Sequence, residues 1–417
     1  MHLLKQVVFF GSLIWFAGPS MIALRATGCT DAAIQQSQKQ AAVAAPEYST
    51  QIMLARQATL EIYEHGMLGN SGSAINNKIG RPPGMSVAVA VDGKIVWAEG
   101  FGLADVEQCV PATPKTKFRI GSTSKPLTSA AAALLYEQGR IDLDAPIQRY
   151  VPSFPDKGQV ITTRELLGHL GGIRHYNAAE EIENQKQYSS VTESLARFKD
   201  DPLIAPPGTK WRYSTYGYVL VSAVIEGASG QDFLTFMHDK VFLPLGMTDT
   251  EADVNDRIIP NRARWYNLTS DGSYRNSPYA DLSYKWAGGG FLSTAEDLVR
   301  FGSALLKPGF LRQDTLVLIF SPQKTSAGEK TRTKYGFCWE IHDAGDPDLG
   351  NHGAMRRFEH GGGAVGSSSV LVIYPDQNVV VAWLQNSDDF RDWPMSRVAA
   401  PFFADRKEVQ PTKSKSK

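Results

Sequence analysis

A serine and a lysine three residues apart supply the side-chain types that nucleophilic catalysis needs. Ser122 and Lys125 precede an Ala- and Leu-rich run that is typical of a helix and ends near Gly139. Such residues share one face of a helix, and a helix N-terminus adds backbone N–H groups and a positive dipole end. A lysine that is partly removed from water there can lose its proton and activate the hydroxyl. The alternative for an isolated Ser-x-x-Lys pair is a solvated first turn with a serine cap.

Two further segments contain groups that could assist such a nucleophile. Tyr213 and Thr215 lie two residues apart, and a phenol can serve as a second general acid or base. Further along the chain, His360 precedes a run of glycines that includes Gly362 and Gly363. Glycines there allow backbone N–H groups to approach a substrate carbonyl. The alternatives are a packed tyrosine with a hydrated hydroxyl and a glycine-rich turn before a strand.

The three segments, in this order, resemble the motifs of the serine β-lactamase-like family, the class C β-lactamase and penicillin-binding type. Ser122 and Lys125 resemble its Ser-x-x-Lys motif, Tyr213 and Thr215 its Tyr-x-Asn motif, and residues 360–362 its Lys-Thr-Gly strand. The resemblance covers residues 82–403. Flanking segments are similar to the family at 85–104, 161–173 and 286–297. A narrower similarity, to the mitochondrial members of animals and their bacterial relatives, lies at 172–176, 261–264, 283–286 and 362–366.

The resemblance implies a mechanism through an acyl-enzyme on Ser122. Lys125 and Tyr213 would share the proton transfers, and the N–H groups of Ser122 and Gly363 would form the oxyanion hole. The residues that it places at the oxyanion or the substrate are Gly363, Thr215, His360 and Gly362. No cofactor and no metal are expected. His175 either lines this site or makes a structural hydrogen bond.

Three departures from the family motifs bear on the substrate. In β-lactamases the lysine and threonine of Lys-Thr-Gly help to bind the substrate carboxylate, and here His360 and Gly361 take their places. A histidine with a pKa of about 6.5 is mostly neutral at pH 7, and glycine has no hydroxyl. Thr215 also replaces the usual asparagine. We therefore expect poor β-lactam turnover and a small peptide, amide or ester substrate whose acyl side lacks that carboxylate, with peptides the leading choice.

Other functions stay open from the sequence. An esterase or a weak β-lactamase uses the same groups, and a scaffold or assembly protein could retain a hydrolase fold. The complete set of Ser122, Lys125 and Tyr213 favours an enzyme. A homo-oligomer is left open.

Composition excludes several classes of protein. The chain has 417 residues, with 42% hydrophobic and 21% charged residues, which is typical of a globular protein with ample core. Lys plus Arg equal Asp plus Glu at 43 each, and no basic patch indicates a nucleic-acid partner. The three cysteines, Cys29, Cys109 and Cys338, allow at most one disulfide. No pair of Cys or His residues has the spacing of zinc ligands.

The N-terminus predicts an exported protein. Lys5 precedes an apolar run at 7–24, so residues 1–28 are interpreted as a signal peptide or a membrane anchor that could tether the chain. A periplasmic, secreted or membrane-anchored location follows. Arg25 is the sole arginine among the first 50 residues, which disfavours a mitochondrial transit peptide, although a mitochondrial location remains the alternative. Residues 29–48 are expected to be a linker, 49–405 the hydrolase domain and 406–417 a disordered basic tail.

The elements that position the motifs are expected to form an α/β fold of the α+β sandwich type. A hairpin at 85–104 turns at Asp92-Gly93, and strands at 370–374 and 379–384 follow near the end of the chain. These strands are expected in one antiparallel sheet, with helices at 49–68 and 393–407 and a helix-rich region between 127 and 293. The resemblance adds that the sheet and its helices lie beside an all-α region, with the serine between them.

Overall fold

The computed structural model describes residues 41–65, 81–269, 273–328, 334–345, 355–388 and 395–403. The predicted signal peptide or anchor at 1–28 and the basic tail at 406–417 lie outside these ranges. Within the ranges, no helix is long and apolar enough to cross a membrane.

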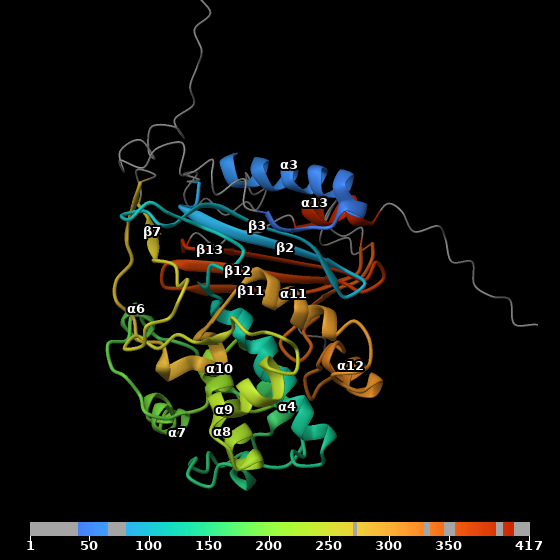
Figure 1. The fold of residues 1–417 in the computed structure, drawn as a ribbon. Coiled ribbons are helices and arrows are strands. Elements are labelled where there is room, and N and C mark those ends of the chain that lie inside the picture. The colour runs from blue at the N-terminus through green and yellow to red at the C-terminus, as the bar shows by residue number, and fades with distance from the viewer. Residues whose placement is uncertain are drawn as a thin grey trace, which may run out of the picture.

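The core of the fold is an antiparallel sheet in the strand order β1-β3-β2-β13-β12-β11-β10, with β4 paired to β3. Figure 1 shows this sheet above a body of helices, with two helices covering its opposite face. Its strands are β1 (Ala41–Ala44), β2 (Gly84–Val91), β3 (Lys94–Asp105), β4 (Val110–Pro111), β10 (Glu340–His342), β11 (Arg357–Ala364), β12 (Ser367–Tyr374) and β13 (Val379–Gln385). The predicted antiparallel sheet with flanking helices is therefore confirmed.

The hairpin between β2 and β3 turns as the sequence predicts. Asp92 and Gly93 have positive φ angles of 53° and 81°, the conformation that a tight two-residue hairpin requires. Side chains alternate between the two faces of β2, so Val87 and Val89 face one core while Ala88 and Ala90 face the other. Both faces are buried, and the strand accordingly has almost no polar residues.

Helices cover the two faces of the sheet. On one face, α3 (Ser49–His65) and α13 (Met395–Ala399) share a hydrophobic cluster with the outer side of β2. On the other face, α11 (Ala295–Ala304) contributes Leu298 and Phe301 to the main core. The described part of the predicted helix at 393–407 thus consists of α13 and a short 3₁₀ turn, Ala400–Phe402.

Part of the expected linker is ordered. β1 pairs with the edge of β3, and a 3₁₀ turn at Pro46–Tyr48 leads directly into α3. Of the linker expected over 29–48, the structure describes residues 41–48, which form this strand and turn.

Two long helices form the centre of the all-α region. In α4 (Ser124–Glu137), nearly every residue is buried, because its alanines allow neighbouring helices to approach closely. α8 (Thr215–Ser229) begins at the N-cap Ser214, whose hydroxyl accepts the N–H of Gly217, and ends at Gly230 in the left-handed conformation. Shorter helices surround them: α5 (Thr163–Leu167), α6 (Ala179–Ile182), α7 (Val191–Ser194), α9 (Phe233–Met237), α10 (Trp286–Gly289) and α12 (Gln313–Ile319).

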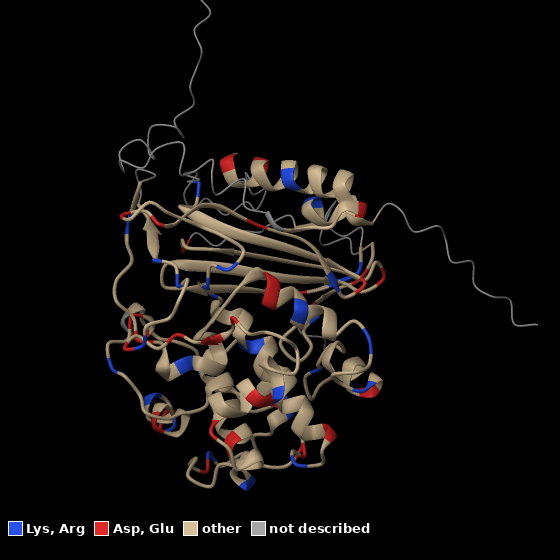
Figure 2. Cartoon of the chain, in the orientation of Figure 1, with Lys and Arg blue, Asp and Glu red and all other residues tan. Residues whose placement is uncertain are grey.

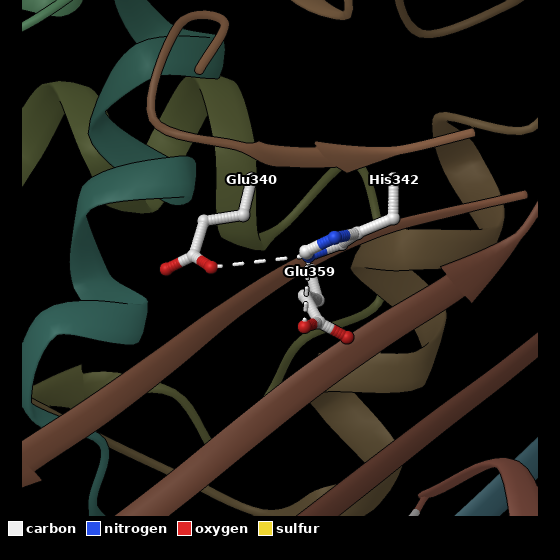
Figure 3. Close-up of side chains that lie close together, drawn as sticks. All are labelled: Glu340, His342 and Glu359. Carbon is white, nitrogen blue, oxygen red and sulfur yellow. Dashed lines mark ion pairs between the residues drawn. The ribbon is translucent and has the colours of Figure 1, made fainter. Parts of the chain in front are cut away.

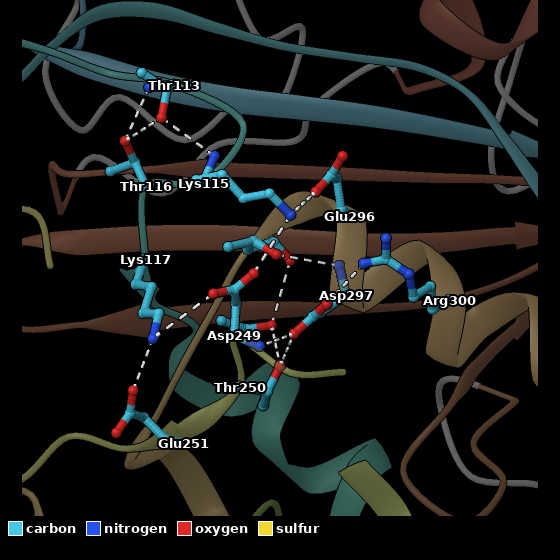
Figure 4. Close-up of polar contacts among 12 residues, drawn as sticks. Thr113, Lys115, Thr116, Lys117, Asp249, Thr250, Glu251, Glu296, Asp297 and Arg300 are labelled. Carbon is cyan, nitrogen blue, oxygen red and sulfur yellow. Dashed lines mark hydrogen bonds and ion pairs between the residues drawn. The ribbon is translucent and has the colours of Figure 1, made fainter. Parts of the chain in front are cut away.

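A polar cluster fixes the chain just before residues 121–123, the turn that contains Ser122 (Figure 4). Lys115 Nζ lies 2.7 Å from a carboxylate oxygen of Glu296 in α11, and Lys117 Nζ lies 2.8 Å from one of Glu251. The carboxylate of Asp297 accepts hydrogen bonds from the N–H of Asp249 and from a threonine hydroxyl. These contacts hold a small sheet of β5 (Phe118–Arg119), β9 (Phe291–Ser293) and β6 (Glu251–Ala252), from which the chain enters the serine turn.

Two short strands complete the description: β7 (Tyr266–Leu268) pairs with β8 (Tyr274–Asn276). Charged residues of both signs are scattered over loops and helix surfaces, while the central strands carry few (Figure 2). This intermixed pattern agrees with the net charge of zero.

Candidate active site

Ser122 and Lys125 come together where the main sheet meets the helices. Ser122 lies in a 3₁₀ turn, Gly121–Thr123, that runs directly into α4, and Lys125 is in the first turn of that helix. Lys125 Nζ lies 2.9 Å from Ser122 Oγ and 2.6 Å from the carbonyl oxygen of Gly288. The lysine side chain is fully buried, and burial lowers its pKa to about 7. A lysine in that state is a competent proton acceptor for the serine hydroxyl.

Glycines allow three backbone segments to converge on the serine turn. Gly121 has a φ of 48°, and a Cβ there would lie 2.5 Å from the carbonyl oxygen of Gly363. A Cβ on Gly362 would lie 2.0 Å from the carbonyl oxygen of Ile120. On the opposite side, a Cβ on Gly288 would lie 2.6 Å from the side chain of Thr215. The sequence requirement for glycine therefore comes from backbone proximity around Ser122.

Tyr213 completes the cluster around Lys125. The centroid of its ring lies 4.8 Å from Lys125 Nζ. Burial raises the pKa of Tyr213 well above its usual value and the charge of Cys338 adds to this, whereas a hydrogen bond with Ser122 opposes it. The phenol therefore keeps its proton at neutral pH, and Lys125 is the group of this cluster that titrates there.

A pocket of about 360 Å³ opens beside Ser122. Of the residues that the sequence placed at the substrate, Thr215 and Gly363 line it. The other lining residues are His175, Tyr176, Ala179, Ile182, Glu183, Asn267, Lys285, Gly288, Gly289, Ala364, Val365 and Asp388. The walls thus come from the helical region on one side and from β11 on the other.

His360 and Gly362 are not among the lining residues, although the sequence placed them at the substrate. Both residues lie on the buried face of β11, because residues two apart on a strand share a face. His360 Nδ1 lies 2.7 Å from the carbonyl oxygen of Gly361, so Nδ1 donates and Nε2 accepts the hydroxyl of Tyr335 at 3.0 Å. Burial lowers the pKa of His360 to about 3, which agrees with a neutral ring. The centroid of the His360 ring lies 6.4 Å from that of Tyr213, so this histidine faces the buried cluster around Lys125 and not the pocket.

Lys285 is a site residue that the sequence reasoning missed. Its side chain is 3% exposed, and Nζ lies 5.3 Å and 5.6 Å from the ring centroids of Tyr284 and Tyr176. Among the described residues its ammonium group has no hydrogen-bond or ion-pair partner. Burial lowers its pKa to about 7, with the charge of Arg119 as the next cause. The available signal was a lone lysine inside the aromatic and glycine-rich segment 283–290.

Two histidines flank the Tyr213 segment. The sequence left open whether His175 lines the site or makes a structural hydrogen bond. His175 does both: it lines the pocket, and its Nδ1 accepts the N–H of Thr215 at 3.2 Å. His169, which the sequence reasoning did not single out, is 2% exposed and packs its ring 4.4 Å from that of Tyr213. Burial lowers the pKa of His175 to about 4 and that of His169 well below its usual value. Both rings are therefore neutral.

One group of potential metal ligands lies on the described residues, outside the pocket (Figure 3). Glu340, His342 and Glu359 bring ligand atoms within 4.8 Å of one another. His342 Nε2 lies 3.0 Å from Glu359, and Arg357 Nε lies 2.7 Å from the other oxygen of that carboxylate. Although burial alone would raise the pKa of Glu359, the contacts with His342 and Arg357 lower it. The Arg357 guanidinium thus already pairs with Glu359.

Comparison with known proteins indicates a serine hydrolase of the β-lactamase-like family. Residues 74–400 match the family model described as Beta-lactamase. The chain is 37% identical to the human "Serine beta-lactamase-like protein LACTB, mitochondrial", covering 73% of this chain and 70% of that protein. It is 27% identical to Penicillin-binding protein 4* of Bacillus subtilis, covering 76% and 70% of the two chains. The protein belongs to the β-lactamase family.

Solved structures share the fold. An octameric penicillin-binding protein homologue from Pyrococcus abyssi superposes with a TM-score of 0.63 at 26% identity, covering 76% of this chain and 72% of that one. A D-amino acid amidase from Ochrobactrum anthropi in complex with L-phenylalanine amide gives 0.67 at 23% identity, covering 85% and 98%. The second likeness concerns the fold alone.

Proposed function

We propose that the protein is a serine peptidase or amidase that acts through an acyl-enzyme on Ser122. The observation that carries the proposal is the contact of 2.9 Å between Ser122 Oγ and the buried Lys125 Nζ, whose pKa is lowered to about 7. A substantial fraction of this lysine is unprotonated at neutral pH and can accept the serine proton. The Lys125 contact with the carbonyl of Gly288 fixes the direction in which Nζ points.

Acylation then proceeds with each proton accounted for. Ser122 Oγ bonds to the substrate carbonyl carbon as its proton passes to Lys125 Nζ. The negative charge that develops on the carbonyl oxygen lies between the N–H groups of Ser122 and Gly363, and one such donor is worth ~2.7–4 kcal/mol. When the tetrahedral intermediate collapses, the leaving amine takes the Tyr213 phenol proton, which Lys125 replaces. Water then attacks the acyl-enzyme, and the same groups return the proton to Ser122.

The environment of β11 argues against β-lactams as the main substrate. His360 is neutral and faces Tyr335, and Gly361 offers no hydroxyl, so this strand supplies no cation for a carboxylate. The buried lysine that lines the pocket is Lys285, whose pKa is lowered to about 7. The exposed acids Glu183 and Asp388 also line the pocket. A peptide or amide whose acyl group carries its charge toward Lys285 fits this arrangement.

An esterase activity uses the same steps with an alcohol as leaving group, and a scaffold needs none of them. The intact contacts among Ser122, Lys125 and Tyr213 favour the enzyme. Because the Pyrococcus abyssi homologue is octameric, a homo-oligomer of this protein is also proposed.

Labelling of purified protein with a fluorophosphonate, followed by a panel of peptides, amides, esters and cephalosporins, tests the function. We expect one labelled site, Ser122, and loss of both labelling and turnover in Ser122→Ala with an unchanged circular dichroism spectrum. Labelling that persists at another serine, or turnover that survives the substitution, would overturn the proposal.

The cellular location is a separate proposal. The human relative is named as a mitochondrial protein, which supports the mitochondrial alternative over export. Fractionation of the native host with N-terminal sequencing of the mature chain decides between them. An intact Met1 on soluble cytoplasmic protein would contradict both.

A further inference from the structure

His169 occupies a backbone position at which glycine is usual. It follows the last turn of α5 with a φ of 59°, and its N–H donates to the carbonyl of Leu166 at 3.2 Å. The N–H of Leu170 donates to the carbonyl of Glu165 at 2.7 Å, which closes the paired hydrogen bonds of a Schellman motif. A side chain at this left-handed position strains the backbone, although histidine tolerates it better than most residues. The turn itself therefore does not explain why histidine is present.

His169 contacts the residues directly before and directly after Tyr213 in the chain. The carbonyl of His169 accepts the N–H of Arg212 at 2.9 Å, and its Nδ1 accepts the N–H of Ser214 at 3.2 Å. Between these two anchors, the imidazole ring packs against the Tyr213 ring with centroids 4.4 Å apart. Three independent contacts from one residue thus hold the backbone and the ring of Tyr213.

His175 makes the same type of hydrogen bond to the next residue along the chain, Thr215. Its Nδ1 accepts the N–H of Thr215, and its ring stands edge-on to Tyr213 with centroids 5.5 Å apart. Ser214 is the N-cap of α8 and Thr215 its first residue, so their N–H groups have no carbonyl partner within the helix. Two imidazole rings therefore accept the N–H groups of Ser214 and Thr215 at the start of α8, directly after Tyr213 in the chain.

We propose that His169, assisted by His175, is a positioning residue that holds the Tyr213 hydroxyl in register with Ser122 and Lys125. The proposal rests on the proposed function for the proton-transfer role of Tyr213, but the clamp itself is a property of the fold. A neutral ring is required, because a protonated Nδ1 would face the Ser214 N–H with a second donor. The charged or titratable groups that face His169 are Lys125, His175, Tyr213, Tyr218, Tyr335 and His360.

Two substitutions separate the hydrogen bond from the backbone strain. His169→Asn keeps an acceptor near the place of Nδ1, and His169→Gly removes the acceptor while suiting the left-handed turn. The readouts are kcat and KM on the best substrate of the panel, the melting temperature, and the ¹⁹F NMR signal of 3-fluorotyrosine placed at position 213 alone. The fluorine signal reports the surroundings of the ring without requiring turnover.

For His169→Gly we expect kcat to fall about 10- to 100-fold with KM within twofold, since misplacement of a catalytic group acts on the chemical step. Its fluorine signal should shift or broaden. His169→Asn should retain kcat within about threefold and the wild-type fluorine signal. Wild-type kcat and fluorine signal in His169→Gly would overturn the proposal, as would equal losses in both variants. A wild-type protein that is neither labelled nor active contradicts the proposed function, and the fluorine comparison still decides on the clamp.

Discussion

Lys125 and Lys285 are two buried lysines in one active site, and the charge of Lys125 is among the causes that lower the pKa of Lys285. Both pKa values are lowered to about 7, for each mainly by burial. One lysine contacts the nucleophile, and the other lines the pocket without a partner among the described residues. The site therefore gains positive charge as the pH falls through neutrality.

The rate of acylation should rise with pH through about 7, because Lys125 must be unprotonated to accept the serine proton. No loss of activity from ionisation of Tyr213 is expected below pH 10, since its pKa is raised well above that value. Stopped-flow measurement of acylation against pH checks this. Lys125→Ala should lose acylation nearly as completely as Ser122→Ala, and near-normal acylation would leave Tyr213 as the sole base.

Lys285→Met should reduce selectivity for anionic acyl groups. A charge-assisted hydrogen bond contributes ~1.5–3 kcal/mol, so kcat/KM for a carboxylate-bearing substrate should fall about 10- to 100-fold. The amide analogue of the same substrate should change little. Lys186→Met, which removes an exposed lysine paired with Glu193, is the matched control. Equal effects of Lys285→Met on both substrates would contradict the assignment.

The two buried lysines should contribute stability that increases as the pH rises from about 7 toward about 10.4. The pKa of each buried lysine is lowered in the folded state, so the unfolded chain binds more protons between that value and about 10.4, and stability is lost as the pH falls through this window. Lys285→Met should weaken this dependence and raise the melting temperature at pH 7. Urea denaturation across the window measures it, and an unchanged slope in the variant would refute the linkage.

Gly362→Ala should destabilise the fold and impair acylation, because its Cβ would collide with the carbonyl of Ile120 beside the catalytic turn. Overpacking of this kind costs ~1–3 kcal/mol. Gly363→Ala is the control for stability, since its Cβ would meet no atom within 4 Å. Thermal denaturation compares the two variants, and equal melting temperatures would show that the backbone contact is unimportant.

Cephalosporins should be poor substrates of the wild-type protein. His360→Lys combined with Gly361→Thr restores the residue types of the family motif and should raise cephalosporin turnover, provided that the new lysine is accommodated beside Tyr335. Spectrophotometric hydrolysis assays compare the two proteins. Efficient cephalosporin hydrolysis by the wild type, with no cleavage of peptides or esters, would count decisively against a peptidase.

The sequence was informative where chemistry depends on local spacing. Ser122 and Lys125 meet because they are one helical turn apart, and Asp92-Gly93 turns a hairpin because few other pairs adopt its dihedral angles. His360 is different, since its role depends on which face of β11 it occupies. That face is set by pairing with β12, and it directs the ring toward Tyr213 and Tyr335, although His360 does not line the pocket.

The positions of Lys285 and His169 in the site could not be predicted from residue spacing. Lys285 reaches the pocket because α10 packs against α4 and α8, and its proximity to Ser122 spans a long stretch of chain. His169 contacts Tyr213 although a long stretch of chain, which includes α6 and α7, separates the two residues. Such relationships depend on tertiary packing, and a single sequence offers no periodic pattern from which to predict them.

The opposed carboxylates of Glu340 and Glu359 have a consequence for assembly. β10 is three residues long and lies at the end of the described sheet, where a strand from another molecule could otherwise add. Short edge strands with charged side chains resist such addition, because a foreign backbone would have to desolvate the carboxylates and the imidazole. Copies of this protein that associate are therefore not expected to pair through the β10 edge, so the sheet does not propagate from one molecule to the next on that side.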